Sequence, residues 1–178
     1  MNRLLSAGAL LIFSAVASAQ DSPGRKLPSV TMAPAALITI TQGKPGTVDL
    51  QFRVGSGFHI NSNTPKSEFL IPTILKVNPP TDIVIGKITY PEGEEMSFPF
   101  APDEKLSVYS GDFMLSVVVR PLRVLPAKYM LHGTLRYQAC DNAACYPPRE
   151  LPVEFEVKIA KAPPPPAKNP AQSPHAHR

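Results

Sequence analysis

The stretch Tyr129-Met-Leu-His-Gly-Thr-Leu-Arg-Tyr-Gln138 decides the fold class, because the character of its side chains alternates from one residue to the next. Leu131, Leu135 and Tyr137 fall on one side of an extended chain, and most of the intervening side chains are polar. A period of two is typical of a β-strand with one buried and one hydrated face. The stretch therefore predicts such a strand, with Tyr137 packed in the core in the register of the two leucines.

The same kind of pattern continues on both sides of this strand. Apolar and polar residues also alternate at 48–54, 113–119 and 153–159, and shorter apolar runs occupy 36–41, 69–77 and 83–88. The chain holds 22 prolines, which interrupt it too often for a long helix. Seven or more short strands, separated by proline and glycine turns over about 125 residues, predict an antiparallel β-sandwich.

The two ends of the chain differ from this middle part. Residues 1–19 have an early arginine, a short apolar stretch and the ending Ala17-Ser18-Ala19, which together are typical of a secretory signal peptide. We therefore expect export with cleavage near Ala19, and no membrane insertion, because no later run approaches about 20 apolar residues. We expect residues 20–33 to be a flexible lead-in, 34–160 the folded domain, and 161–178, with four consecutive prolines, a disordered tail.

The net charge of +4 does not indicate a nucleic-acid partner. Arg3 lies in the signal peptide, and Lys161, Lys168 and Arg178 lie in the tail, so the 18 basic residues fall to 14 in the remainder, equal to its 14 acidic ones. A formally neutral domain with few aromatic residues has no basic stripe that could hold phosphates. We therefore expect no nucleic-acid partner.

The two cysteines of the chain, Cys140 and Cys145, follow the strand quoted above and are separated by four residues. The next predicted strand begins near Leu151, so the pair falls in a connection at one edge or end of the sandwich. A disulfide that closes so small a ring contributes roughly 2 kcal/mol in the loop-entropy model, the low end for such bonds. The spacing therefore favours a disulfide that opens and closes over a purely structural one.

Two other interpretations of the cysteines stay open. An exported protein can carry a purely structural disulfide, and thiols can also bind a metal. Two cysteines are too few for a closed zinc site, and nothing in the sequence places His59 or His132 near them. We expect His59 to be a hydrogen-bonded structural histidine, and His132 and the tail histidines His175 and His177 to be solvated. We therefore assign no metal ligands, and two alternative functions stay open: a non-catalytic binding module with a structural disulfide, and a periplasmic metal-binding domain.

Two separated motifs carry a family resemblance. The first runs from Gly57 to Thr73 (GFHINSNTPKSEFLIPT), and the second is Tyr137-Gln-Ala-Cys140 followed by Cys145-Tyr-Pro-Pro148. Together they resemble the N-terminal periplasmic domain of the DsbD family of thiol–disulfide interchange proteins, over about residues 30–160. The resemblance implies an immunoglobulin-like sandwich in the periplasm and calls for no cofactor.

The resemblance also implies a function for the cysteine pair. In this family the pair shuttles between dithiol and disulfide, receiving electrons from a membrane-embedded donor and passing them to oxidised periplasmic proteins, including thioredoxin-fold proteins. By that resemblance Cys145 attacks and forms mixed disulfides, and Cys140 resolves them. Since the sequence shows no transmembrane stretch and no thioredoxin-like module after the domain, we expect the donor to be a separate chain.

An aromatic cap that shields the pair is a further implied feature. Its counterpart here is the run Met96-Ser-Phe-Pro-Phe100, with Phe98 the first choice for the cap and Phe100 the second. Tyr137 and Tyr146, which flank the cysteines, are candidates for lining the site, although core packing is the first expectation for Tyr137.

The sequence departs from the family pattern in the same region. The spacer between the cysteines holds four residues, where some family members have five. The cap segment has no acidic-acidic-aromatic run, although Glu94 and Glu95 lie just before it. We expect these two carboxylates to belong to a solvated turn.

Overall fold

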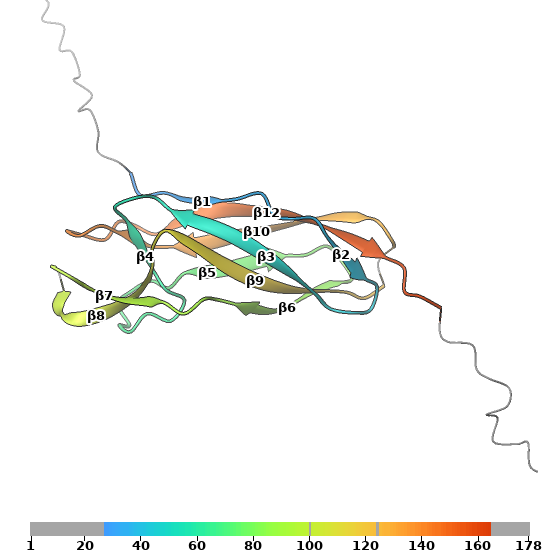
Figure 1. Ribbon diagram of the computed structural model, residues 1–178, viewed down its shortest axis with the longest axis horizontal. Helices are drawn as coiled ribbons and strands as arrows, with labels where there is room; N and C mark the ends of the chain where they lie inside the picture. Colours follow the sequence, from blue (N-terminus) through green and yellow to red (C-terminus); the bar gives the residue numbers. More distant parts are fainter. Residues whose placement is uncertain (1–26, 100, 124, 165–178) are drawn as a thin grey trace, which may run out of the picture.

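The computed structural model describes residues 27–99, 101–123 and 125–164 (Figure 1). The predicted signal peptide, most of the predicted tail and Phe100 lie outside these residues. Within the described ranges the regular elements are all strands, and no helix is present that could cross a membrane. The strands are β1 (Val30–Met32), β2 (Ile38–Thr41), β3 (Gly46–Val54), β4 (His59–Asn61), β5 (Ile74–Asn78), β6 (Ile83–Thr89), β7 (Glu94–Phe98), β8 (Ala101–Tyr109), β9 (Asp112–Pro121), β10 (Lys128–Tyr137), β11 (Ala139–Cys140) and β12 (Arg149–Ala160).

These strands form three sheets, with the orders β1-β3-β9-β6, β2-β12-β10-β5 and β11-β4-β8-β7. The strands pair antiparallel in all three sheets, apart from β2, which runs parallel to β12. The first two sheets lie one over the other along the length of the molecule, and β4, β7 and β8 of the third sheet lie at one end (Figure 1). The fold is thus an immunoglobulin-like β-sandwich, as the sequence and the resemblance predicted.

The main core lies between the two long sheets and follows the predicted alternation. Every second residue from Phe113 to Val119 in β9 and from Val153 to Ile159 in β12 is buried. Leu131, Leu135 and Tyr137 of β10 belong to the same core. Burying one such side chain stabilises a fold by about 1.5–3 kcal/mol, so these alternating sets hold the two sheets together.

The structure corrects three local predictions. Residues 30–32, expected in a flexible lead-in, form β1, where Met32 pairs with Phe52 of β3. The strand expected over residues 69–77 begins only at Ile74, and Phe69 is 87% exposed. The expected turn at Glu94 and Glu95 is the start of β7, whose first four residues are all exposed. Apolar and polar residues do not alternate in a strand without a buried face, so the sequence did not predict β7.

Candidate redox site at the cysteine loop

The third sheet places the cysteine loop against β4. Cys140 of β11 pairs with His59, and Ala139 pairs with Ile60. In an antiparallel sheet, directly paired side chains share a face, and neighbours along a strand point to opposite faces. Ile60 and Ala139 belong to the main core. The side chains of His59 and Cys140 therefore lie together on the other face of this small sheet.

The two cysteines form a disulfide, with an S–S distance of 2.03 Å and 3.9 Å between their Cα atoms. They also form an isolated antiparallel bridge, so the chain between them folds back on itself. Cys140 is fully buried, whereas Cys145 is exposed. Because thiol–disulfide exchange requires access to the attacked sulfur, this geometry favours exchange at Cys145.

Asp141 shapes the loop between the cysteines. Its Oδ1 atom accepts hydrogen bonds from the backbone N–H groups of Ala143 and Ala144, at 2.8 Å and 2.9 Å, which is the pattern of an Asx turn. Its Oδ2 atom accepts a hydrogen bond from the Tyr146 hydroxyl at 2.7 Å. The carboxylate thus fixes both the turn and the aromatic residue next to Cys145, and it places a negative charge beside the pair.

Gln138 joins this loop to the segment that follows β4. Its Oε1 atom accepts hydrogen bonds from the Asn61 side-chain amide at 3.2 Å and from the Ile71 backbone N–H at 3.3 Å. Its Nε2 atom donates to the Tyr146 carbonyl at 3.2 Å. The Asn61 amide also donates to the Ile71 carbonyl at 3.0 Å. One glutamine therefore connects both sides of the cysteine loop.

His59 lies on the cysteine side of this sheet and is only 4% exposed. Its ring stacks on that of Phe98, with centroids 3.9 Å apart and an interplanar angle of 16°. Burial lowers the pKa of His59 to about 4, partly opposed by the negative charge of Asp141, so the ring is neutral at pH 7. Among the described residues, its Nε2 atom has no hydrogen-bond partner. The expectation of a hydrogen-bonded histidine is wrong for this nitrogen, which is buried in a ring that stacks on Phe98.

The structure places two of the candidate residues next to close neighbours of the cysteines. Phe98 of β7 is buried with Leu106 and Val108 of β8 in a second apolar cluster, and it reaches the cysteine strand through the ring of His59. Tyr146 is half-buried, and its ring meets that of Phe58 edge to face, with centroids 5.9 Å apart.

The remaining candidates are placed differently. Tyr137 packs in the main core as its register predicted, and its lining role stays a prediction. Phe100 lies outside the described residues. Sequence reasoning did not assign roles to Gln138 and Asn61, although both lie inside the motifs that carried the resemblance. Only the folded structure shows that these two side chains bond to each other.

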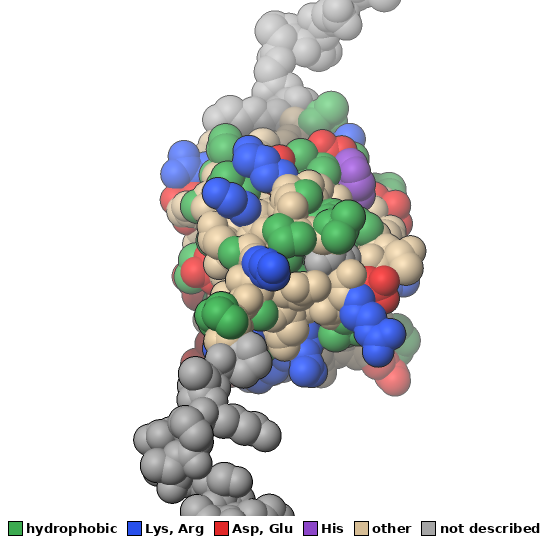
Figure 2. Space-filling view, turned by 90° about the vertical axis from the view of Figure 1, so that its right-hand side faces the viewer, with side chains coloured by type: hydrophobic (Ala, Val, Ile, Leu, Met, Phe, Trp, Pro, Cys, Tyr) green, Lys and Arg blue, Asp and Glu red, His purple; other side chains and the backbone are tan. Residues whose placement is uncertain are grey.

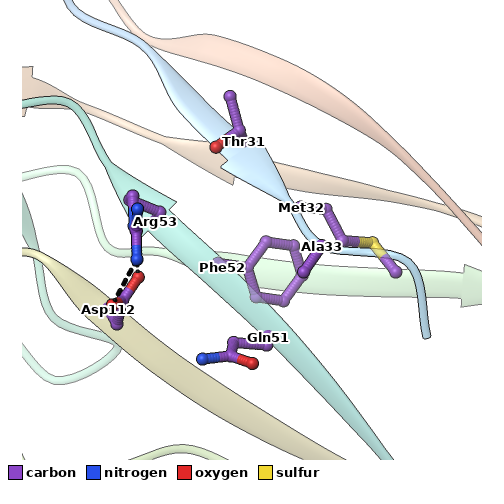
Figure 3. A pocket seen from close by; sticks show the side chains of 7 residues that line it. All are labelled: Thr31, Met32, Ala33, Gln51, Phe52, Arg53 and Asp112. Atoms are coloured by element: carbon purple, nitrogen blue, oxygen red, sulfur yellow. Dashed lines mark hydrogen bonds and ion pairs between the residues drawn. The ribbon is translucent and has the colours of Figure 1, made fainter. Parts of the chain in front are cut away.

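We also considered two other parts of the surface, a hollow beside β1 and β3 and the end of the sandwich far from β4. Thr31 to Ala33 of the β1 segment, Gln51 to Arg53 of β3, and Asp112 line a hollow of about 310 Å³ (Figure 3). It is crossed by a two-bond ion pair between Arg53 and Asp112, at 2.6 Å and 2.8 Å. At the end of the sandwich facing away from β4, Lys and Arg side chains are scattered among apolar and neutral ones (Figure 2).

The described parts of the chain hold no group of three His, Cys, Asp or Glu side chains placed to bind a metal ion. His132, expected to be solvated, is exposed, and its Nδ1 atom lies 3.1 Å from a carboxylate oxygen of Glu154. His175 and His177 lie outside the described residues.

Comparisons with known proteins identify several similar solved structures. Similar solved structures include the reduced N-terminal domain of DsbD from Neisseria meningitidis, at 23% identity over 62% of this chain and 75% of that one, with a TM-score of 0.40. The complex between the DsbD and PilB N-terminal domains of the same organism is similar at 23% identity, over 62% of this chain and 73% of that one, with a TM-score of 0.37.

A third solved structure is similar over a longer part of the chain. The N-terminal periplasmic domain of ScsB from Proteus mirabilis is 12% identical, over 75% of this chain and 48% of that one, with a TM-score of 0.50. No curated protein sequence matches the chain. The family model of the thiol:disulfide interchange protein DsbD, N-terminal, matches residues 28–157, which is well over half of the sequence, and the chain therefore belongs to the family of DsbD N-terminal domains.

Proposed function

We propose that the protein is a periplasmic interchange domain that passes reducing equivalents to oxidised protein partners through Cys140 and Cys145. The observation that carries this proposal is the asymmetry of the disulfide, in which Cys145 is exposed and Cys140 is fully buried. An exchange site needs one sulfur that a partner can reach and a second that stays shielded until it is used. Family membership supports the same chemistry.

The reaction starts from the dithiol form. The Cys145 thiolate attacks one sulfur of a partner's disulfide, forming a mixed disulfide and releasing the partner's other sulfur as a thiolate. Cys140, deprotonated in turn, then attacks the sulfur of Cys145. The Cys140–Cys145 bond forms, the bond to the partner breaks, and the partner's second sulfur leaves as a thiolate. Two electrons and two protons thereby pass to the partner, which becomes a dithiol.

The location and partners of the protein belong to the same proposal. Residues 1–19 read as a secretory signal peptide, and a disulfide persists in an oxidising compartment such as the periplasm. Within this scheme, oxidised clients with a thioredoxin fold accept the electrons. A membrane-embedded thiol protein restores the dithiol.

Trapping of mixed disulfides tests the proposal. A Cys140→Ala variant keeps the attacking thiol and loses the resolving one, so it should accumulate covalent adducts with periplasmic proteins that disappear on reduction. The matched Cys145→Ala variant should accumulate few. If Cys145→Ala alone captures partners, the roles of the two cysteines are reversed.

The reduction potential separates this function from that of a binding module with a structural disulfide. An exchangeable pair should equilibrate with glutathione, whereas structural disulfides typically have potentials below about −300 mV. A potential well below that value, together with no trapped partner from either variant, would contradict the interchange function.

A further inference from the structure

The Nε2 atom of His59 stands out because it is a buried polar atom without a hydrogen-bond partner among the described residues. Such atoms are rare in folded proteins, because burial removes the water that would otherwise bond to them. The unpaired nitrogen lowers the stability of the oxidised protein, since this structure contains the Cys140–Cys145 disulfide. We therefore looked for a hydrogen-bond donor that would be present next to this nitrogen in the reduced protein.

Cys140 is the residue placed to supply that partner. His59 and Cys140 are directly paired across β4 and β11, so their side chains share one face and their Cβ atoms lie about 5 Å apart, as in antiparallel pairs generally. Both residues are buried, at 4% and 0% exposure. In the disulfide the sulfur of Cys140 carries no hydrogen and cannot donate a bond to the ring.

We propose that His59 is a positioning residue of the redox pair, whose Nε2 atom accepts a hydrogen bond from the Cys140 thiol when the disulfide opens. Reduction adds two electrons and two protons, breaks the S–S bond and leaves a thiol on each cysteine. The new S–H group of Cys140 is then a donor next to a buried acceptor. The inference deepens the proposed function and rests on the pair opening and closing in the working protein.

The surroundings of His59 suit this role. The stacked ring of Phe98 restricts the orientation of the imidazole. Leu106 and Val108, which cluster with Phe98, are apolar and offer no side-chain donor that competes for the nitrogen. Asp141 supplies the charge that acts on the ring, and its two oxygens already accept bonds from the loop. The neutral ring keeps one nitrogen free of a proton, as an acceptor requires.

The hydrogen bond has a direct consequence for redox equilibrium. It stabilises the dithiol form and is absent from the disulfide form, so it makes the pair easier to reduce. A tenfold effect on the equilibrium constant is the expected size, and for a two-electron couple this corresponds to about 30 mV. The same bond holds the Cys140 thiol in place while Cys145 engages a partner.

Equilibration with glutathione, read out by alkylation of free thiols, tests the inference. A His59→Phe variant keeps a flat ring against Phe98 and removes the acceptor, so its equilibrium constant for reduction should fall about tenfold. His59→Gln, which restores an acceptor, should recover part of the loss. His132→Phe alters an exposed histidine and should match the wild type. An equilibrium constant for His59→Phe within twofold of the wild type would overturn the inference.

A second measurement uses the unmodified ring and does not depend on how the His59 variants fold. The nitrogen chemical shift of His59 Nε2 should change on reduction of the wild-type protein in the direction of a hydrogen-bonded acceptor. The same change should be missing in the Cys140→Ala variant, which has no thiol at that position. An Nε2 shift that is the same in oxidised and reduced wild type would contradict the proposed bond.

Failure of this inference can be told apart from failure of the proposed function. Both measurements use the isolated protein without a client, whereas trapping reports on clients alone. Trapped partners with an unchanged potential in His59→Phe would leave the interchange function intact and reject the role of His59. A shifted potential in His59→Phe without trapped partners would support the role of His59 and reject the interchange function.

Discussion

The ring of His59 lies nearly parallel to the ring of Phe98, with their centroids 3.9 Å apart. This contact joins β4, which carries the strand partner of Cys140, to β7, which carries the residue predicted as the aromatic cap. Through His59, Phe98 is therefore one residue away from Cys140 in the third sheet. If Phe98 is the cap, as the resemblance implies, its loss should expose the disulfide to reductants.

Replacing Phe98 with alanine tests the cap. The change removes a side chain that is 4% exposed, so the free energy of unfolding should fall by about 3 kcal/mol. Reduction of the disulfide by dithiothreitol should become several-fold faster, because the ring over His59 is gone. Phe69→Ala is the matched control, since Phe69 is 87% exposed. Equal reduction rates in the two variants would reject Phe98 as the cap.

Replacing Asp141 separates its charge from its hydrogen bonds. Asp141→Asn keeps an oxygen that can accept from Ala143 and Ala144 but removes the negative charge. The pKa of the Cys145 thiol should therefore fall, because a nearby negative charge disfavours the thiolate. Asp141→Ala loses the turn as well and should also destabilise the protein by about 1–2 kcal/mol. Thiolate absorbance against pH measures the first effect and urea unfolding the second; an unchanged thiol pKa in Asp141→Asn would refute the charge effect.

Replacing Gln138 tests the connection between the cysteine loop and the segment after β4. Gln138→Ala leaves the Ile71 N–H and the Tyr146 carbonyl without this partner. The free energy of unfolding should fall by about 2 kcal/mol. Hydrogen exchange at Ile71 should also become faster. Gln51→Ala, at an exposed position of β3, should change neither quantity. Unaltered exchange at Ile71 in Gln138→Ala would show that the glutamine does not hold the segment.

The main sandwich was predictable because its strands carry one buried and one hydrated face. The alternation of apolar and polar residues around Leu131 and Leu135 predicts which side chains are buried, and these two leucines lie in the core of the structure. β4 and β7 of the third sheet have no such alternation in their sequences. β4 is buried at all three of its positions, and the first four residues of β7 are all exposed. Neither strand alternates, so neither was predicted in full.

The residues of the candidate site could be predicted only where they belong to a recognisable sequence motif. The cysteine pair and Phe98 follow from spacing and resemblance. The pairing of His59 with Cys140 depends on a register between strands that lie about 80 residues apart, which no local pattern encodes. The contact between Asn61 and Gln138 has the same origin.

The lowered pKa of His59 determines how stability depends on pH. In the unfolded chain a histidine titrates near 6.5, whereas the folded ring titrates near 4. Above pH 6.5 the ring is neutral in both states. Between pH 6.5 and pH 4 the unfolded chain binds a proton that the folded protein does not, so stability falls as the pH falls.

Unfolding by urea at pH 7 and pH 5 tests this sign. The wild type should lose about 1–2 kcal/mol over that interval, after allowance for partial hydration of the ring. His59→Phe should lose less, because phenylalanine takes up no proton in the unfolded chain. His132→Phe should keep the wild-type loss, since His132 is exposed. The interval does not go below pH 5, so Asp112 and Glu95, whose pKa values are lowered by Arg53 and Lys66, remain ionised throughout. Equal losses in His59→Phe and in the wild type would mean that His59 is not held neutral by burial.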